Sequence, residues 1–214
     1  ANLEQAADII CLSRIINAGQ SCIAAKRVIV EADVHDRFIE LVEQRLGKLR
    51  LGDPLQADTD IGPIAREDLQ LNLHRQVEET IAAGAKCRLG GHLPEGAGFF
   101  YPVTLLTCVT PPMCAFREET FGPVMVIIRA DDVDQALEMA NDTEYGLGAG
   151  IWTENASLAK SLALQIDSGQ VAINGIVKTD PRLPSGGIKG SGYGRELGPQ
   201  GIKEFVNAKQ IWIK

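Results

Sequence analysis

The sequence predicts an α/β fold with a largely parallel sheet, helices on both faces of that sheet, and an edge strand at the C-terminus. Segments with helical spacing of apolar residues alternate along the chain with short β-branched runs, and this alternation is typical of a parallel sheet covered by helices. A length of 214 residues with 45% hydrophobic residues suits one α/β domain, or one large domain with a small appendage. The last five residues place three apolar side chains between two polar ones, which predicts an apolar edge strand.

Capping signals place the helices of the first half. Asn2 is suited to cap a helix that begins at the first residues, with Gln5 at the capping-box position. Asp33 is expected to cap a second helix, and Gly84 to follow a third as its C′ glycine. The expected order is a helix from Asn2, a strand near 26–31, a helix from Asp33, a loop over 51–63 and a helix over 66–83.

The second half continues the alternation of strands and helices. We expect strands near 86–89 and 101–108 around the Gly-rich loop 90–98, a strand near 123–129, a helix near 132–141, a strand near 147–152, a helix near 156–167 and a strand near 170–174. The final strand, 210–214, is apolar, and such an edge strand at a terminus would seek a partner. It is a candidate contact between subunits of a homo-oligomer, and pairing within the chain is the alternative.

Charge and composition exclude several classes of partner. The net charge is −7 and the isoelectric point is about 5.0, whereas nucleic acids and anionic membranes attract basic surfaces. No apolar run approaches the roughly 20 residues that a membrane span needs. The first residues also lack the basic and apolar regions of a secretory signal. The sequence therefore predicts no nucleic-acid partner and no membrane partner.

The cysteines indicate free thiols rather than a disulfide framework. They number five, with irregular spacing, and no CxxC pair occurs: Cys11, Cys22, Cys87, Cys108 and Cys114. None of the three histidines stands near a cysteine at a ligand-like spacing, so no structural metal is predicted. A reducing cytoplasm is the simplest interpretation of this pattern.

Cys22 lies at a junction suited to a nucleophile. It follows an amphipathic helix and precedes the β-branched run 27–30, so its thiol is expected on an exposed turn beside backbone N–H groups. Access and donors for the oxyanion are what a cysteine nucleophile needs. The alternative is that Cys22 is a small buried hydrophobe, as most free cysteines are.

Two other segments have an unusual composition. Residues 117–124 place two carboxylates, an aromatic ring and a Gly-Pro turn before a strand; alone, they are compatible with a solvated acidic turn. Residues 184–196 are rich in glycine, which indicates close backbone approach or positive φ angles. This segment is neither a Walker A loop nor a dinucleotide fingerprint, because the required spacing is missing.

Together these segments resemble the aldehyde dehydrogenase superfamily. Residues 19–22 resemble its nucleophile motif and residues 119–123 its second motif, while 185–192 with 194–196 resemble the C-terminal one. Residues 141–147, between them, agree as well. The resemblance covers essentially the whole chain. Within the superfamily, the runs 22–30 and 180–184 look most like a bacterial branch of succinate-semialdehyde dehydrogenases.

The resemblance implies a mechanism and a set of roles. Cys22 would be the nucleophile, passing from a thiohemiacetal to a thioester while NAD or NADP receives the hydride. Glu119 corresponds to the family's ribose-binding glutamate, and Phe121 to the aromatic residue beside the nicotinamide. The chain would thus be part of an oxidoreductase acting on a small aldehyde. A CoA-acylating relative, in which CoA resolves the thioester, stays open.

Two positions depart from the family pattern and bear on the substrate. Ser185 stands where the family usually has a phenylalanine that lines the aldehyde pocket, and its hydroxyl would suit a polar or anionic substrate tail. Ile16 stands where succinate-semialdehyde enzymes place an arginine for the carboxylate. Arg182 is a candidate replacement because its guanidinium pairs well with carboxylates, and a surface loop arginine is the alternative.

The resemblance also implies a division of the protein. Residues 1–205 would form the catalytic domain, with 206–214 as a C-terminal oligomerisation strand. Family members are roughly twice as long, and their N-terminal nucleotide-binding half supplies the general base and an oxyanion-hole asparagine. We therefore expect that half to be a partner of this chain and the isolated chain to be inactive or nearly so. A non-catalytic thiol or oligomerisation module is the rival hypothesis.

Overall fold

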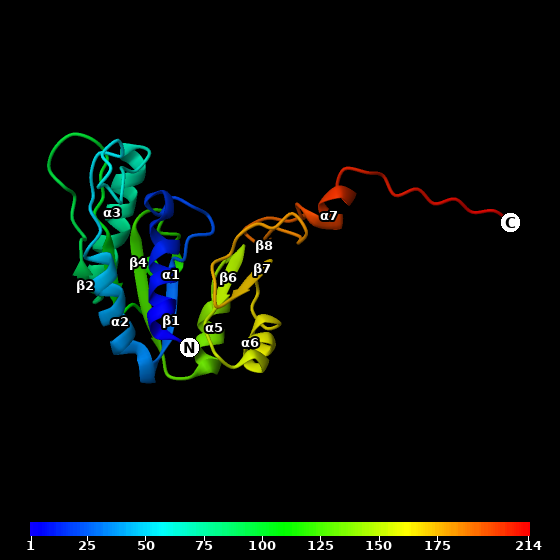
Figure 1. Ribbon diagram of the computed structural model, residues 1–214, viewed down its shortest axis with the longest axis horizontal. Coiled ribbons are helices and arrows are strands. Elements are labelled where there is room, and N and C mark those ends of the chain that lie inside the picture. The colour runs from blue at the N-terminus through cyan, green and yellow to red at the C-terminus, as the bar shows by residue number, and fades with distance from the viewer.

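The core of the molecule is a four-stranded sheet. The computed structural model describes all 214 residues, and its strands follow the order β1-β4-β3-β2 (Figure 1). The strands are β1 (Arg27–Glu31), β2 (Lys86–Leu89), β3 (Thr104–Thr107) and β4 (Val124–Ala130). β1 and β3 each pair in parallel with β4, while β2 pairs antiparallel with β3.

Helices cover both faces of this sheet, as the sequence predicts. The helices are α1 (Leu3–Ile15) and α2 (Ala32–Leu46) on one face, and α3 (Glu67–Ala82) with the short α4 (Cys114–Arg117) on the other. β4 is a central strand, and its side chains point alternately into the two hydrophobic cores on either face of the sheet. Met125 and Ile127 pack with α1 and α2, whereas Val126 and Ile128 pack with α3 and α4. A strand covered on both faces needs a continuous apolar run, and β4 has one.

The second half of the chain forms a looser set of elements beside the sheet. α5 (Val133–Asn141) leads to β6 (Gly148–Ile151), and α6 (Ala156–Ala163) leads to β7 (Gln170–Ile173). β6 and β7 pair in parallel as a separate two-stranded sheet. No residue of α5 is buried, and only Ala159 of α6 is buried. The predicted parallel pairing is therefore confirmed, but the structure divides it between two sheets.

Most local predictions hold, and the differences have physical reasons. Asn2 caps α1 by accepting a hydrogen bond from the Gln5 N–H at 3.1 Å, and Gly84 follows α3 with φ +110°. Asp33 lies in the first turn of α2, since Glu31 takes the N-cap position. The remaining elements are too short for periodicity to reveal: the 3₁₀ helix η1 (Ile16–Gly19), the antiparallel pair β5 (Tyr145–Gly146) and β8 (Ile188–Lys189), and α7 (Gly198–Lys203).

The C-terminal segment corrects one expectation. Residues 210–214 form no strand and pair with no edge of the chain, and the tail extends away from the remaining elements (Figure 1). Ile211, Trp212 and Ile213 are 78%, 76% and 87% exposed. The apolar residues that suit a strand are present, but a strand also needs a neighbouring edge. None of the helices has the length and apolar character required to cross a membrane.

Truncating the centre of β4 is expected to destabilise the fold strongly. Ile127 is fully buried, so Ile127→Ala leaves a cavity and should lower the free energy of unfolding by about 2–5 kcal/mol. Ile211→Ala in the exposed tail is the control, with an expected change within about 0.5 kcal/mol. Urea unfolding followed by circular dichroism measures both, and equal effects would contradict this placement of the core.

Candidate active site

The Cys22 loop begins with an unusual run of backbone conformations. Asn17, Ala18 and Gly19 have φ angles of +54°, +52° and +74°, and left-handed conformations are unfavourable for residues with a Cβ. They end the helical segment abruptly, and the chain then turns through Cys22. The Cys22 residue is exposed, which settles the choice between an accessible thiol and a buried one.

Gly19 brings the Cys22 loop against the segment that carries Glu119. A Cβ on Gly19 would lie 2.1 Å from the carbonyl oxygen of Gly122 and 2.8 Å from the Arg14 guanidinium. Only a residue without a Cβ can come this close to the Gly122 carbonyl. Glycine also adopts a positive φ angle, such as that of Gly19, without strain. Two motifs about a hundred residues apart in sequence are thereby placed in contact.

A buried arginine holds both ends of the loop. The Arg14 side chain is fully buried and donates hydrogen bonds to the carbonyl oxygens of Gly19 at 2.5 Å and Ala25 at 3.3 Å. The Ala25 N–H in turn donates to Ser13 Oγ at 3.2 Å. Burial lowers the pKa of Arg14 to about 10, and the Glu119 carboxylate acts in the opposite direction. α1 thus fixes where the loop leaves and where it returns.

Lys26 joins the loop to the Glu119 segment. Its ammonium group donates to the carbonyl oxygens of Ser21 at 3.2 Å, Cys22 at 3.1 Å and Ala24 at 3.4 Å. The same group forms an ion pair with Glu119 at 3.0 Å. Burial lowers the pKa of Lys26, while the hydrogen bond to Glu119 raises it. One cation therefore orients the Cys22 main chain and a carboxylate together.

Phe121 completes this group of predicted site residues. The Lys26 ammonium lies 5.8 Å from the centre of its ring, within the range of a cation–π contact. The ring is 36% exposed, so one part of it is open to a ligand. The structure thus brings together three residues singled out from the sequence, Cys22, Glu119 and Phe121.

The surroundings of Cys22 provide space and a free donor. The backbone N–H of Cys22 makes no hydrogen bond within the chain, so it is available to an oxyanion. Cys22, Lys26 and Glu119 are among the residues that line a cavity of about 680 Å³. The arrangement fits a thiol that reacts with a carbonyl group while a neighbouring carboxylate accepts hydrogen bonds from a second ligand.

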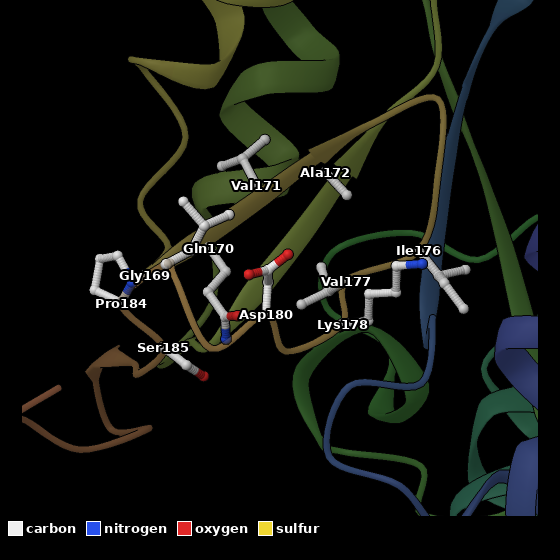
Figure 2. A pocket seen from close by; sticks show the side chains of 11 residues that line it. Gly169, Gln170, Val171, Ala172, Ile176, Val177, Lys178, Asp180, Pro184 and Ser185 are labelled. Carbon is white, nitrogen blue, oxygen red and sulfur yellow. The ribbon is translucent and has the colours of Figure 1, made fainter. Parts of the chain in front are cut away.

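Ser185 and Arg182 are placed elsewhere. Ser185 lines a separate cavity of about 290 Å³ beside β7, together with Asp180 (Figure 2). The Arg182 side chain is 84% exposed, lines neither of these cavities, and engages both oxygens of Asp180 at 2.8 and 2.6 Å. Their suggested roles toward a substrate thus remain predictions, and the guanidinium of Arg182 already has a carboxylate partner.

Arg14 and Lys26 were not identified from the sequence. Arg14 falls among the apolar positions of α1, and a charge on that face was the signal available. Lys26 stands directly before a β-branched strand, where a lysine is unremarkable.

Asn174, at the end of β7, has a structural role. Its side-chain oxygen accepts a hydrogen bond from the Thr153 N–H at 3.0 Å, and its side-chain NH₂ donates to the Thr153 carbonyl oxygen at 2.8 Å.

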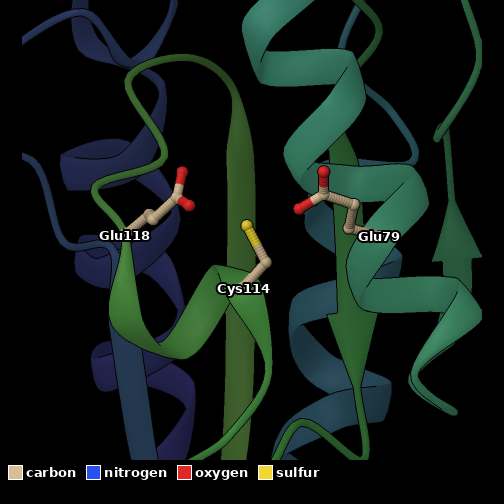
Figure 3. Close-up of side chains that lie close together, drawn as sticks. All are labelled: Glu79, Cys114 and Glu118. Atoms are coloured by element: carbon tan, nitrogen blue, oxygen red, sulfur yellow. The ribbon is translucent and has the colours of Figure 1, made fainter.

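A second cluster of polar groups lies away from the Cys22 loop. Glu79, Cys114 and Glu118 point toward one another from α3, α4 and the segment after α4 (Figure 3). Arg75 donates to both carboxylates at 2.8 Å, and burial raises the pKa of the Cys114 thiol to about 11. The carboxylates are thus committed to a guanidinium, and the cluster joins α3 to α4.

Comparison with known proteins settles the family. A profile described as the aldehyde dehydrogenase family matches residues 1–211. The chain belongs to the aldehyde dehydrogenase family. A probable NADP(+) succinate-semialdehyde dehydrogenase from Synechocystis is 49% identical over 213 residues, and an NADP(+) succinate-semialdehyde dehydrogenase from Mycobacterium leprae is 46% identical. Each match covers 100% of this chain and 47% of the relative.

Solved aldehyde dehydrogenases share the fold. Succinic semialdehyde dehydrogenase from Streptococcus pyogenes, in complex with NADP+, has a TM-score of 0.95 at 36% identity, covering 100% of this chain and 47% of its own. An NAD-dependent aldehyde dehydrogenase from Sinorhizobium meliloti has a TM-score of 0.92 at 38% identity, covering 96% and 41%. This aldehyde dehydrogenase chain therefore spans about half the length of the relatives that it matches.

A methyl group on Gly19 is expected to separate the two motifs. Gly19→Ala meets the Gly122 carbonyl and should destabilise the chain by about 1–3 kcal/mol through overpacking, beyond the strain of a positive φ. Gly96→Ala is the matched control, since Gly96 also has a positive φ but no atom lies within 4 Å of its Cβ position. Urea unfolding of both variants measures the difference, and equal losses would contradict the close approach.

The Arg182–Asp180 pair gives a pH-dependent signal. The side-chain hydrogen bond to Arg182 lowers the pKa of Asp180 from 3.8 to about 2. Because the folded pKa is depressed, the contribution of the pair is present above the unfolded pKa and is lost as the pH falls through about 2. NMR titration of the Asp180 carboxyl should show this value, and Arg182→Gln should move it upward. An unchanged pKa in that variant would contradict the pairing.

Proposed function

We propose that this chain is the cysteine-bearing catalytic part of an NADP- or NAD-dependent aldehyde dehydrogenase that oxidises a small aldehyde to a carboxylate. Succinate semialdehyde is the favoured substrate, because the relatives at 46% and 49% identity carry that name. The observation that carries the proposal is the exposed Cys22 on a loop whose main chain is held by Lys26, with Glu119 on the same ammonium group. An oligomerisation module would need none of these contacts.

The steps proposed for this chain use Cys22 and the groups around it. The sulfur attacks the carbonyl carbon, the C=O π bond opens, and the negative charge moves to oxygen. The free Cys22 N–H is the donor for that oxyanion, and one such donor is worth roughly 3 kcal/mol to a transition state. After hydride loss the acyl group stays on the sulfur as a thioester, which water then hydrolyses.

The residues present fit one side of a nicotinamide dinucleotide. Glu119 is about one-third exposed and offers acceptors to ribose hydroxyls, while Phe121 presents part of its ring beside it. When bound, the cofactor accepts the hydride. Lys26 fixes the Glu119 carboxylate, so the acceptor is oriented before any ligand arrives. We expect the phosphates to be held by the half of the relatives' length that this chain does not span.

The substrate carboxylate requires a cation, and Arg182 is our candidate. Ile16, at the position where the family's succinate-semialdehyde enzymes have arginine, is apolar and 44% exposed. Arg182 would have to exchange Asp180 for the substrate, and Ser185 would add a hydroxyl to a polar pocket. Both assignments require the 176–185 segment to lie near Cys22 when substrate is bound.

Other properties of the whole protein are part of the same proposal. The exposed apolar tail 206–214 would pair with another subunit in a homo-oligomer, because Ile211 and Ile213 have no partner in the chain. Five free cysteines suit a reducing cytoplasm. Without the general base that the family supplies from its other half, the isolated chain should form an acyl-cysteine but resolve it slowly.

Acylation by an activated ester tests the nucleophile in the chain alone. p-Nitrophenyl acetate should acetylate Cys22: the sulfur–carbon bond forms, the ester C–O bond breaks, and nitrophenolate leaves. We expect a burst of nitrophenolate and an acetyl group on the Cys22 peptide by mass spectrometry. Cys22→Ser should abolish the burst, whereas Cys108→Ser, at another exposed cysteine, should keep it. Equal labelling of Cys22 and Cys108 would refute an activated nucleophile.

Removing the Lys26 ammonium should impair the site more than the fold. Lys26→Met releases three carbonyl oxygens of the Cys22 loop and Glu119, and we expect the burst to slow about tenfold, equivalent to about 1.4 kcal/mol. Lys160→Met is the control, since Lys160 is exposed on α6. Stopped-flow absorbance gives the rates, and identical rates for the two variants would refute the role of Lys26.

A further inference from the structure

The Lys26 ammonium lies against the residue to which the proposed function gives an acyl group. It donates to the carbonyl oxygen of Cys22 at 3.1 Å and to that of Ser21 at 3.2 Å. Between them the chain makes a tight turn, in which the Ala24 N–H donates to the Ser21 carbonyl oxygen at 3.1 Å. Because lysine has a flexible four-carbon side chain, its nitrogen can turn from the Cys22 carbonyl oxygen to a group on the sulfur of the same residue.

The surroundings of Lys26 favour its neutral form. Its side chain is 17% exposed, and burial lowers its pKa, which increases the fraction present as free amine. Negative charge on the Cys22 sulfur acts in the opposite direction. Acylation of the sulfur removes that charge, so the neutral amine becomes more populated when Cys22 carries an acyl group.

Glu119 is an acceptor for the proton that the ammonium must lose. Its carboxylate oxygen lies 3.0 Å from Nζ of Lys26, and its side chain is about one-third exposed, so it can pass a proton on to water. A proton acceptor within hydrogen-bond distance is what general-base catalysis requires. Lys26 therefore contacts both a base and the proposed carrier of the acyl group.

A thioester on Cys22 would have an amine and water as competing acceptors. A neutral lysine nitrogen is a nucleophile toward carbonyl carbon. Groups held together in one site also react far faster than the same groups free in solution, because their encounter no longer costs entropy. Since we expect slow hydrolysis in the isolated chain, the amine has time to react.

We propose that Lys26 is an acyl acceptor, to which an acyl group passes from the Cys22 sulfur and on which it remains as an amide. This inference rests on the proposed role of Cys22 and adds a second covalent step. The ammonium gives one proton to Glu119, and the neutral nitrogen adds to the thioester carbonyl carbon. The C–N bond forms, the C–S bond breaks, and the sulfur takes the second proton from nitrogen. No oxidant or reductant takes part, because only an acyl group and protons move.

The transfer removes the charge that holds the Cys22 loop. An ammonium has three donors, which here serve the loop carbonyls and Glu119, whereas the amide has one N–H and no charge. The acylated chain regains a Cys22 thiol but loses the contacts that orient it. We expect its second acylation to be about tenfold slower than the first, as for Lys26→Met. The modification therefore limits itself.

A pulse of p-nitrophenyl acetate, followed by removal of the excess reagent, tests the transfer. Hydroxylamine at neutral pH cleaves an acetyl thioester and leaves an acetyl amide intact, so peptide mass spectrometry distinguishes the two. The label should move from Cys22 to Lys26 with time. Acetyl-Lys26 should exceed acetyl-Lys160 by about tenfold or more, since Lys160 is exposed on α6. Cys22→Ala should lower the labelling of Lys26 to the level of Lys160.

Lys26→Arg is the matched variant at the acceptor, because a guanidinium keeps the positive charge and has no free amine. Its thioester on Cys22 should persist until water removes it. Mixing this acetylated variant with the Cys22→Ala chain should leave Lys26 of the second chain unlabelled, since the transfer occurs within one chain.

Three results would overturn the inference: loss of the Cys22 thioester with no label on Lys26, label on Lys26 that does not depend on Cys22, or label that passes between chains. If Cys22 takes no acetyl group at all, the proposed function fails together with the inference. If Cys22 is acetylated and the label never reaches Lys26, only the inference fails.

Discussion

The guanidinium of Arg14 is the contact on which the Cys22 loop depends. Three consecutive left-handed residues are unfavourable, and they persist because Arg14 binds the carbonyl oxygens on both sides of the loop. A fully buried charge is costly unless it is satisfied, so the loop and the arginine stabilise each other. α1 needs Arg14 paired, and Gly19 can approach Gly122 only while that pairing holds the turn closed.

Lys26 extends this arrangement from the loop to the segment that carries Glu119. A single ammonium has three donors, and here they are shared among loop carbonyls and the Glu119 carboxylate. The proposed nucleophile, Cys22, and the proposed ribose acceptor, Glu119, are therefore not positioned independently. A displacement of Glu119 would reach the Cys22 main chain through the Lys26 side chain alone.

The sequence predicted most elements because their signals are local. The apolar run of β4 and the caps of α1 and α3 depend on neighbouring residues, and the nucleophile and Glu119 stand in motifs that a reader can match. Arg14 was not predicted because its hydrogen-bond partners are backbone carbonyls, which carry no sequence identity. Lys26 was not predicted because three of its partners are also backbone carbonyls and its carboxylate partner, Glu119, is distant in the sequence. The tail 210–214 was expected as an edge strand because its apolar residues suit strand pairing, but these residues do not report whether an edge is available. The division of the parallel strands into two sheets could not be predicted either, because the sequence of a strand does not say which edge it pairs with.

The separation between the two sets of elements also has a consequence for how the protein changes by mutation. The Cys22 loop rests on the core formed by α1, β1 and β4, whereas Ser185 and Arg182 belong to segments around β7 that share none of its contacts. Substitutions in distant, unconnected regions add their effects independently. The surface around β7 is therefore free to vary in shape and charge while the Cys22 loop keeps its geometry.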